Sequence, residues 1–400
     1  MPATHITRGS RAYLRANSAL FFAGFVTFST LYTFQPLFPN LVDEFGITPT
    51  VASLSLSFAT LALALTLPVS GSLSDAWNRR GLMGISVILA SLLAILSGLH
   101  LSLPTLLGIR LIQGIILAGV PAVAMAYLNE EIEAQAVGSA MGLYIAGNAF
   151  GGMTGRILTA WLTELMNWRA AVIGIGLIGL VLGMLFLALL PPSRNFQRRP
   201  LRIGPLSRSL WTHLTDPGLF CLFSIALCCM GGFVTLYNYI TFRLMGPEFN
   251  LSHAQVALIF LAYAFGACGS TVMGVLVDKF RRSNILFVSL LIMGLGLFLT
   301  LSAALPAVIV GIVVFTIGFF GAHAIASAWV GHLATSARAQ AASLYLFAYY
   351  LGSSLSGTGG GLFYSAWGWP GVTLLILILI GCAALAGILL NRRSTPTPSP

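Results

Sequence analysis

The stretch GSLSDAWNRR, residues 71–80, lies between two long apolar runs, and a related stretch, GVLVDKFRR, occupies residues 274–282 between two others. Both begin with glycine, place an aspartate four residues later and end in two arginines. They lie about half a chain length apart in a sequence of 400 residues. A loop that recurs in this way indicates that the chain is built from two related halves.

Two further matches between the halves fall inside apolar runs. The sequence GFVT at residues 24–27 recurs at residues 232–235, and residues 143–151 share a Leu-Tyr pair and a final glycine with residues 344–352. Halves of the same orientation predict a pseudo-two-fold axis along the membrane normal, with a site between them. We therefore expect an N-terminal bundle at 1–190, a basic cytoplasmic linker at 191–216 and a C-terminal bundle at 217–400.

The composition excludes a soluble protein, a disordered chain and a fibre. Of the residues, 57% are hydrophobic and only 8% are charged, which is far from the average of globular domains. A membrane-spanning helix needs about 20 apolar residues, so this chain has room for roughly twelve of them. We predict an all-α polytopic membrane protein with spans near 16–42, 51–69, 82–99, 103–128, 136–162, 170–190, 218–242, 254–277, 285–305, 306–333, 341–364 and 372–390.

The basic residues predict the orientation of these spans. Of 20 Lys and Arg residues, most fall in alternate loops, which the positive-inside rule assigns to the cytoplasm. Both termini are therefore predicted to be cytoplasmic, in a bacterial inner membrane. This placement between apolar runs also argues against a nucleic-acid partner.

Two more motifs lie within predicted spans, RLIQG at residues 110–114 and GNAFGG at residues 147–152. With the repeated loop, they resemble the major facilitator superfamily over essentially the whole chain. The stretches GLYI at 142–145, NWR at 167–169 and SLYLFAYYLGSS at 343–354 resemble, more narrowly, its bacterial acriflavine-sensitivity branch. The resemblance implies two six-helix bundles, alternating access and proton-driven export of small amphipathic compounds.

The same resemblance implies a gating motif in the repeated loops, where the aspartates would latch onto a helix N-terminus of the other half. Simple solvation of these loops is the alternative. The motif comprises Gly71, Asp75, Arg79, Arg80, Gly274, Asp278, Lys279 and Arg282.

Arg110 is the strongest single candidate for transport. A charged side chain at the centre of a span costs at least about 2.5 kcal/mol, so Arg110 should face the bundle interior or water. Gln113 lies on the same helical face. Arg110 either binds substrate or couples protons, or it is an interhelical structural donor.

Gln35 and Arg243 form a second candidate pair. The register of the GFVT repeat aligns them on opposite sides of the pseudo-axis, near the outer ends of spans one and seven. They are expected either to face an outer cavity or, for Arg243, to reach the headgroups.

His323 and Ser327 place polarity four residues apart in the otherwise apolar tenth span. Because imidazole titrates near pH 6.5, His323 is a candidate proton carrier. The alternative is a neutral ring that donates to a neighbouring carbonyl. Aromatic and amide groups would complete a substrate-binding lining, or else pack between helices: Tyr144, Asn148, Tyr237, Asn238, Tyr345 and Tyr349.

All ten acidic residues lie in loops or at span ends, and Glu130, Glu131 and Glu133 are expected to form a solvated turn. A cavity with Arg110 and no carboxylate would favour anionic, zwitterionic or neutral substrates. An exporter or facilitator of an anionic or zwitterionic metabolite, such as an organic acid, amino acid or siderophore, therefore remains the alternative function.

No catalytic motif supports an enzyme, and the five cysteines have no metal-ligand spacing. We expect no cofactor, no metal and a monomer whose partners are substrate, protons and lipid.

Overall fold

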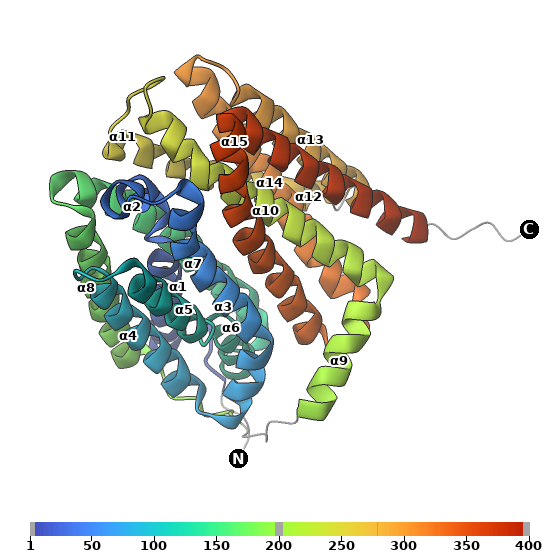
Figure 1. Ribbon diagram of the computed structural model, residues 1–400. Coiled ribbons are helices and arrows are strands. Elements are labelled where there is room, and N and C mark those ends of the chain that lie inside the picture. The colour runs from blue at the N-terminus through green and yellow to red at the C-terminus, as the bar shows by residue number, and fades with distance from the viewer. Residues whose placement is uncertain (1–4, 197–202, 278, 395–400) are drawn as a thin grey trace, which may run out of the picture. The chain divides into compact units, whose positions relative to one another are not determined.

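The computed structural model describes residues 5–196, 203–277 and 279–394, except a few side chains such as that of Asp75. Its elements run in the order α1 (Arg11–Tyr32), η1 (Gln35–Leu37), α2 (Phe38–Phe45), α3 (Pro49–Ala76), α4 (Arg79–Ser97), α5 (Leu103–Leu117), α6 (Pro121–Glu131), α7 (Ala134–Leu165), α8 (Trp168–Leu189), α9 (Ile203–Thr215), α10 (Pro217–Met245), α11 (His253–Ala257), η2 (Leu258–Leu261), α12 (Ala262–Val277), α13 (Arg282–Leu299), α14 (Leu305–Leu333) and α15 (Arg338–Ser394). Within these ranges the β structure is one isolated bridge, between Ile6 and Ile132. The predicted all-helical fold is confirmed (Figure 1).

Each predicted span lies on helical structure. In the described residues, 10 ranges are long and apolar enough to cross a membrane. The last of these, Arg338–Arg392, holds the two final predicted spans, because the backbone of α15 leaves the helical region at Gly368, with a φ of 61°. The predicted fifth span is the 32-residue helix α7.

Prolines break two predicted spans into shorter helices. In the first predicted span, helix α1 ends at Tyr32. The span continues through η1, which contains Pro36, into α2. The fourth is divided into α5 and α6, which starts at Pro121. Proline lacks the backbone N–H and clashes with the preceding turn, which favours a break at these two positions.

The chain forms two compact units that are described separately. Unit 1 comprises Met1–Asn40 and Phe58–Arg202, and unit 2 comprises Leu41–Ser57 and Ile203–Pro400. The segment 41–57 is held in unit 2 by α15: Ser354 Oγ donates to the Ser57 carbonyl at 2.7 Å, and Thr358 Oγ1 lies 2.7 Å from Ser57 Oγ. The sequence did not predict this grouping.

In unit 1, glycines allow α7 to pack directly on α1. A β-carbon at Gly147 would lie 2.6 Å from the Phe21 carbonyl oxygen, and one at Gly151 would lie 2.5 Å from Phe25 Cα. In unit 2, Gly352 of α15 lies in the same way against Leu227 of α10. Each unit therefore contains a close helix crossing of this kind.

This crossing has a different register from the GFVT match between residues 24–27 and 232–235. Gly151 and Gly352 occupy equivalent places, and their contacts are Phe25 and Leu227, so equivalent positions in α1 and α10 are 202 residues apart. The GFVT match instead requires a shift of 208 residues. The pairing of Gln35 with Arg243 rests on the GFVT register, which this crossing does not share, and the pairing stays a prediction.

The close crossing predicts a large difference between two identical substitutions in α7. We expect Gly151→Ala to lower the stability of the purified protein by about 1–3 kcal/mol, because the added methyl group overlaps the backbone of α1. Gly142→Ala is the matched control, because nothing lies within 4 Å of a β-carbon there. Thermal unfolding in detergent measures both, and equal melting temperatures would contradict the packing.

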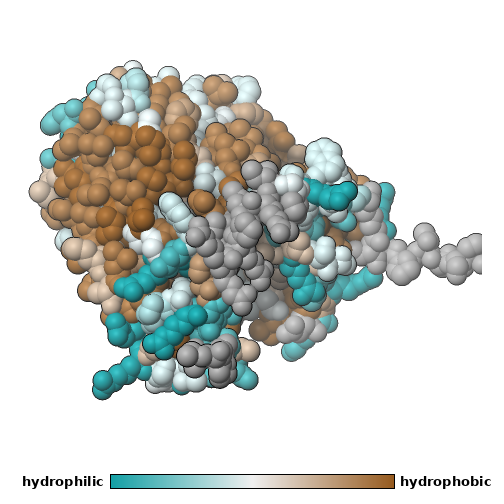
Figure 2. Space-filling view, turned by 90° about the horizontal axis from the view of Figure 1, so that it is seen from below, coloured by the Kyte–Doolittle hydropathy of each residue, from teal (hydrophilic) through white to brown (hydrophobic). Residues whose placement is uncertain are grey.

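Large apolar side chains on the outside are arranged in helical stripes. In α4, Ile85, Leu89, Leu92 and Leu96 are all at least 40% exposed, and their spacing places them on one face. Figure 2 shows a broad hydrophobic surface at the upper left of the view, with hydrophilic side chains gathered below it. Such surfaces suit a lipid environment, in which only backbones with internal hydrogen bonds are stable.

Candidate functional site

Arg110 lies fully inside unit 1. Its guanidinium donates from Nη1 to the Thr30 carbonyl at 3.1 Å and from Nη2 to the Leu31 carbonyl at 2.5 Å, both near the end of α1. Nη1 also donates to the side-chain carbonyl of Gln113, and the Arg110 Cζ atom lies 4.9 Å from the centre of the Phe34 ring. These contacts favour the interhelical-donor interpretation in the conformation observed.

Gln113 extends this network to a third helix. Its Nε2 donates to the Ala90 carbonyl of α4 at 2.7 Å. Arg110 and Gln113 on α5 therefore join the carbonyl groups of α1 and α4 through one charge-assisted chain of hydrogen bonds. The sequence predicted that these two residues share a helical face. In the structure, that face bonds to carbonyl groups of Thr30, Leu31 and Ala90.

A second buried arginine, which the sequence analysis did not select, lies on α7. Arg156 is 1% exposed, and its Nε donates to Gln35 Oε1 at 2.5 Å. Its Cζ lies 3.8 Å from the centre of the Tyr32 ring. Gln35, a predicted cavity residue, is therefore buried against Arg156. A cation within an apolar run was the signal that could have identified Arg156, as it did Arg110.

Tyr144 and Asn148 lie one turn apart on α7. Tyr144 is 2% exposed. A β-carbon at Gly24 of α1 would collide with Asn148 Oδ1, so this amide occupies the space that the glycine leaves. The structure thus places both side chains toward the packing of unit 1.

Arg243 lies in the last turn of α10 in unit 2. It donates to both oxygens of Glu248, at 2.8 and 2.6 Å, and to the carbonyl oxygens of Thr300 and Ser302. Hydrogen bonding from Arg243 lowers the pKa of the exposed Glu248 carboxyl. A cavity of about 400 Å³ adjoins this pair and is also lined by Phe242, Tyr364 and Trp369.

His323 of α14 lies against two tyrosines of α15. Its Nδ1 is 3.0 Å from Tyr345 Oη, and that hydroxyl also lies 3.3 Å from the His323 carbonyl. The Tyr349 ring centre is 4.8 Å from the imidazole centre. Ser327, one turn further along α14, donates to the Ala324 carbonyl at 3.1 Å. The imidazole is half-buried, and its ring nitrogen faces a hydroxyl instead of the carbonyl considered above.

An aromatic group extends from His323 into unit 2. Phe319 stacks on the imidazole with an interplanar angle of 8°, and the centre of the Phe233 ring lies 3.8 Å from that of Phe319. Phe233 in turn contacts Tyr237 and Tyr263. The imidazole therefore lies within a continuous set of aromatic faces contributed by α10, α12, α14 and α15.

Tyr237 and Asn238 are neighbours in sequence but contact different helices. Tyr237 Oη lies 2.8 Å from Thr316 Oγ1 of α14, whereas Asn238 Nδ2 donates to the Gly357 carbonyl of α15 at 3.3 Å. Both side chains are fully buried. Tyr237 therefore belongs to the aromatic group, and Asn238 to the crossing of α10 and α15.

Arg79 joins the first repeated loop to the end of α6. It donates from Nε to Glu130 Oε2 at 2.6 Å, from Nη2 to Glu130 Oε1 at 2.5 Å, and from Nη1 to Ser74 Oγ at 2.6 Å. Arg80 donates to the Leu187 carbonyl of α8. These two arginines of the expected gating motif thus make contacts inside unit 1.

The rest of that motif is only partly described. Asp278 and the side chain of Asp75 lie outside the described residues. Lys279 is exposed, Arg282 begins α13, and Gly274 has open space around it. Gly71 belongs to α3. The proposed latch role of the aspartates stays a prediction.

The expectation that Glu130, Glu131 and Glu133 form a solvated turn is wrong. Glu130 is paired with Arg79, and Glu131, 1% exposed, accepts from the Asn195 backbone N–H at 2.9 Å. Glu133 accepts from the backbone N–H of Arg8 at 2.5 Å. These partners are distant in the sequence, so no local pattern indicated them.

The geometry therefore offers two different environments. Unit 1 buries two guanidinium groups against carbonyl, amide and aromatic groups, and unit 2 holds a half-buried imidazole among aromatic rings. Within the described ranges, no group of three or more His, Cys, Asp or Glu residues is placed to hold a metal ion.

Comparison with known proteins extends over the whole chain. A family model described as Major Facilitator Superfamily matches residues 20–244 and 237–400. The MFS-type transporter YybF of Bacillus subtilis is 45% identical over 98% of this chain and 98% of its own length. The inner membrane transport protein YnfM of Escherichia coli is 42% identical, over 98% of this chain and 94% of its own.

A solved structure has the same fold. The bacterial homologue of the human lysosomal transporter Spinster superposes with a TM-score of 0.80 at 18% identity, covering 98% of this chain and 100% of that one. The family match and the two relatives identify the membrane-spanning helices as those of a transporter. The chain belongs to the Major Facilitator Superfamily.

Proposed function

We propose that this transporter is a proton-coupled exporter of small amphipathic compounds, working by alternating access. The observation that carries the proposal is the position of His323 within the apolar helix α14. Its Nδ1 lies 3.0 Å from Tyr345 Oη of α15. An ionisable group inside a span is costly and marks a functional pathway. Imidazole is also the side chain that most readily exchanges a proton near neutral pH.

The aromatic group beside His323 supports flat amphipathic substrates. Phe319 and Tyr349 lie on the imidazole, and both Tyr263 and Tyr349 remain partly exposed. Aromatic rings with a hydroxyl at the edge offer an apolar face and a polar handle together. A site of this kind accepts compounds by shape and stacking without a fixed set of hydrogen bonds.

A second candidate, export or facilitated passage of an anionic or zwitterionic metabolite, rests on Arg110 and Arg156, two of the buried arginines of unit 1. Arg110 and Arg156 are each at most 1% exposed. Their positive charges act at long range in a medium of low dielectric constant. If the substrate path passes close to either group, organic anions will be preferred over cations.

The relatives support a location in the bacterial inner membrane. One is named as an inner membrane transport protein of Escherichia coli. We further propose that the N- and C-termini face the cytoplasm, because of the arginine distribution, and that the protein acts as a monomer. Substrate, protons and bilayer lipid are then its partners, without a cofactor.

Transport into proteoliposomes under an imposed pH gradient tests the proposal. Substrate should accumulate in the more acidic compartment, because protons leave that compartment as substrate enters it. The accumulation should stop when an ionophore removes the pH gradient. A flux that ignores the gradient would contradict proton coupling and leave a facilitator. Competition between ethidium-like cations and carboxylates of matched size then separates the two substrate classes, since preference for the carboxylates favours the second candidate.

A further inference from the structure

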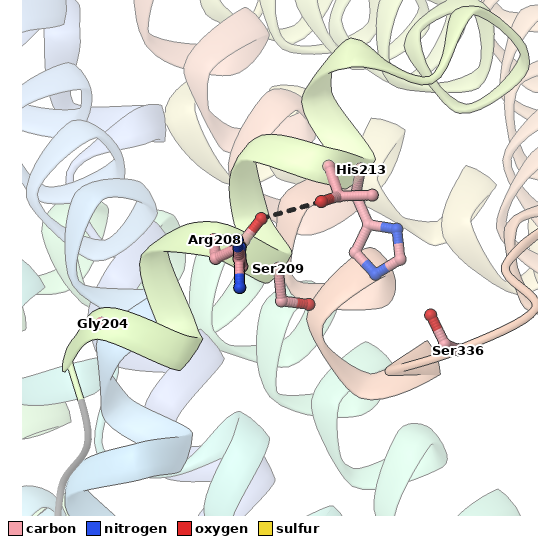
Figure 3. Close-up of a pocket in the computed structure, with 6 residues that line it drawn as sticks. Gly204, Arg208, Ser209, His213 and Ser336 are labelled. Atoms are coloured by element: carbon pink, nitrogen blue, oxygen red, sulfur yellow. Dashed lines mark hydrogen bonds between the residues drawn. The ribbon is translucent and has the colours of Figure 1, made fainter.

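The linker helix α9 and the loop after α14 line an open cavity of about 590 Å³ in unit 2 (Figure 3). The neighbouring spans fix its depth, because α10 begins at Pro217 and α14 ends at Leu333. A β-carbon at Gly218 would lie 2.6 Å from a methyl group of Leu333, so these two helix ends are in contact. The cavity therefore lies where membrane spans end, which is the level of lipid headgroups.

The lining is rich in hydrogen-bond donors and carries no acidic residue. It is formed by Gly204, Arg208, Ser209, Thr212, His213 and Ser336. Thr212 Oγ1 donates to the Arg208 carbonyl at 2.9 Å, which is the dashed line in Figure 3. Asp216, which follows α9, is engaged separately as the cap of α10, accepting from the backbone N–H groups of Gly218 and Leu219.

His213 supplies an independent indication of a ligand. The residue is only 5% exposed, and its Nε2 is buried without a hydrogen-bond partner among the described residues. In Figure 3 its imidazole projects into the cavity, with Ser209 and Ser336 on either side. Buried polar atoms almost always have a partner, so an acceptor placed in this cavity would satisfy the imidazole N–H.

The other face of α9 is suited to a membrane surface. Trp211 is 69% exposed and Leu214 is 39% exposed. Tryptophan is enriched where hydrocarbon meets headgroups, and amphipathic helices lie in that plane with the apolar face in lipid. The helix therefore presents apolar side chains to the bilayer while its polar residues line the cavity.

We propose that this cavity binds a phosphate group, carried either by an anionic phospholipid or by free phosphate. Arg208 provides the positive charge and a planar set of donors that match phosphate oxygens. The hydroxyls of Ser209 and Ser336 and the His213 N–H add neutral donors. The bound group would tie the linker helix to the loop between α14 and α15.

Two probes distinguish the sources of the phosphate. The purified full-length protein is exchanged into nanodiscs of phosphatidylcholine with or without phosphatidylglycerol, and retained lipid is measured by native mass spectrometry after release. In parallel, thermal unfolding in detergent is followed with inorganic phosphate and with chloride at equal ionic strength. Retained phosphatidylglycerol indicates a lipid ligand, a melting shift with phosphate alone indicates free phosphate, and either result supports the site.

Three variants make the test specific. Arg208→Gln and His213→Gln should each weaken binding of the active probe roughly fivefold, as expected for one lost ionic or polar contact. Arg338→Gln is the matched control, because Arg338 is an exposed arginine at the start of α15 that does not line the cavity. Arg208 is also exposed, so its replacement leaves folding intact.

Absence of binding by both probes would overturn the proposal. An equal loss in Arg338→Gln would do the same, because it would show general attraction to a basic surface. Unchanged binding in both Arg208→Gln and His213→Gln would show that the probe is held elsewhere.

Discussion

Replacing Arg110 by alanine is expected to abolish transport and to lower the stability of a protein that still folds. The guanidinium donates to the carbonyls of Thr30 and Leu31 and to Gln113. Without it, these buried acceptors lose a charged donor, and each unsatisfied group costs about 1–3 kcal/mol. Thermal unfolding of the purified variant measures the loss of stability, and proteoliposome flux measures transport.

Arg110→Lys separates charge from geometry. Lysine keeps the positive charge but concentrates its donors at one nitrogen, whereas the arginine reaches the two carbonyls of α1 from separate nitrogens. We expect stability between those of wild type and Arg110→Ala, with transport largely lost. Normal transport by a well-folded Arg110→Ala protein would reject any role of this residue in the cycle.

The positions of the spans could be predicted because apolar content is a local property of the sequence. The breaks at Pro36 and Pro121 were missed, because one hydrophobic run can hold two helices and hydropathy does not report backbone angles. The GFVT register has a different weakness. A match of four residues such as GFVT arises easily among apolar helices, and only the contacts of Gly151 and Gly352 distinguish it from true equivalence.

Candidate site residues could be identified from the sequence where a polar or charged side chain occurs within an apolar span. Arg110 was evident because a cation within a span is expensive. Its acceptors were not evident, because backbone carbonyls occur at every residue. Glu130 was misread as solvated because its partner Arg79 is 51 residues away, and side-chain pairing at that range follows only from the helix packing.

Replacing His323 by glutamine is expected to remove proton-driven transport while leaving substrate exchange in the absence of a gradient. Glutamine can still form a hydrogen bond with Tyr345, but it cannot carry a proton. With one proton per substrate, a pH difference of one unit supports roughly tenfold accumulation. We expect that ratio in wild type and a ratio near one in His323→Gln, measured in proteoliposomes by gradient-driven uptake and by counterflow.

Two neighbouring variants show whether the imidazole itself is responsible. Ser327→Ala lies one turn away on α14, where the hydroxyl donates only to the local Ala324 carbonyl, and it should keep the wild-type accumulation ratio. Tyr345→Phe removes the hydroxyl 3.0 Å from Nδ1 but keeps the imidazole, so it should shift the pH dependence of uptake without abolishing coupling. Tenfold accumulation by His323→Gln would mean that the ring only packs within the aromatic group. The proton would then have to be carried by another group or by the substrate, and the proposed mechanism would lose the residue on which it rests.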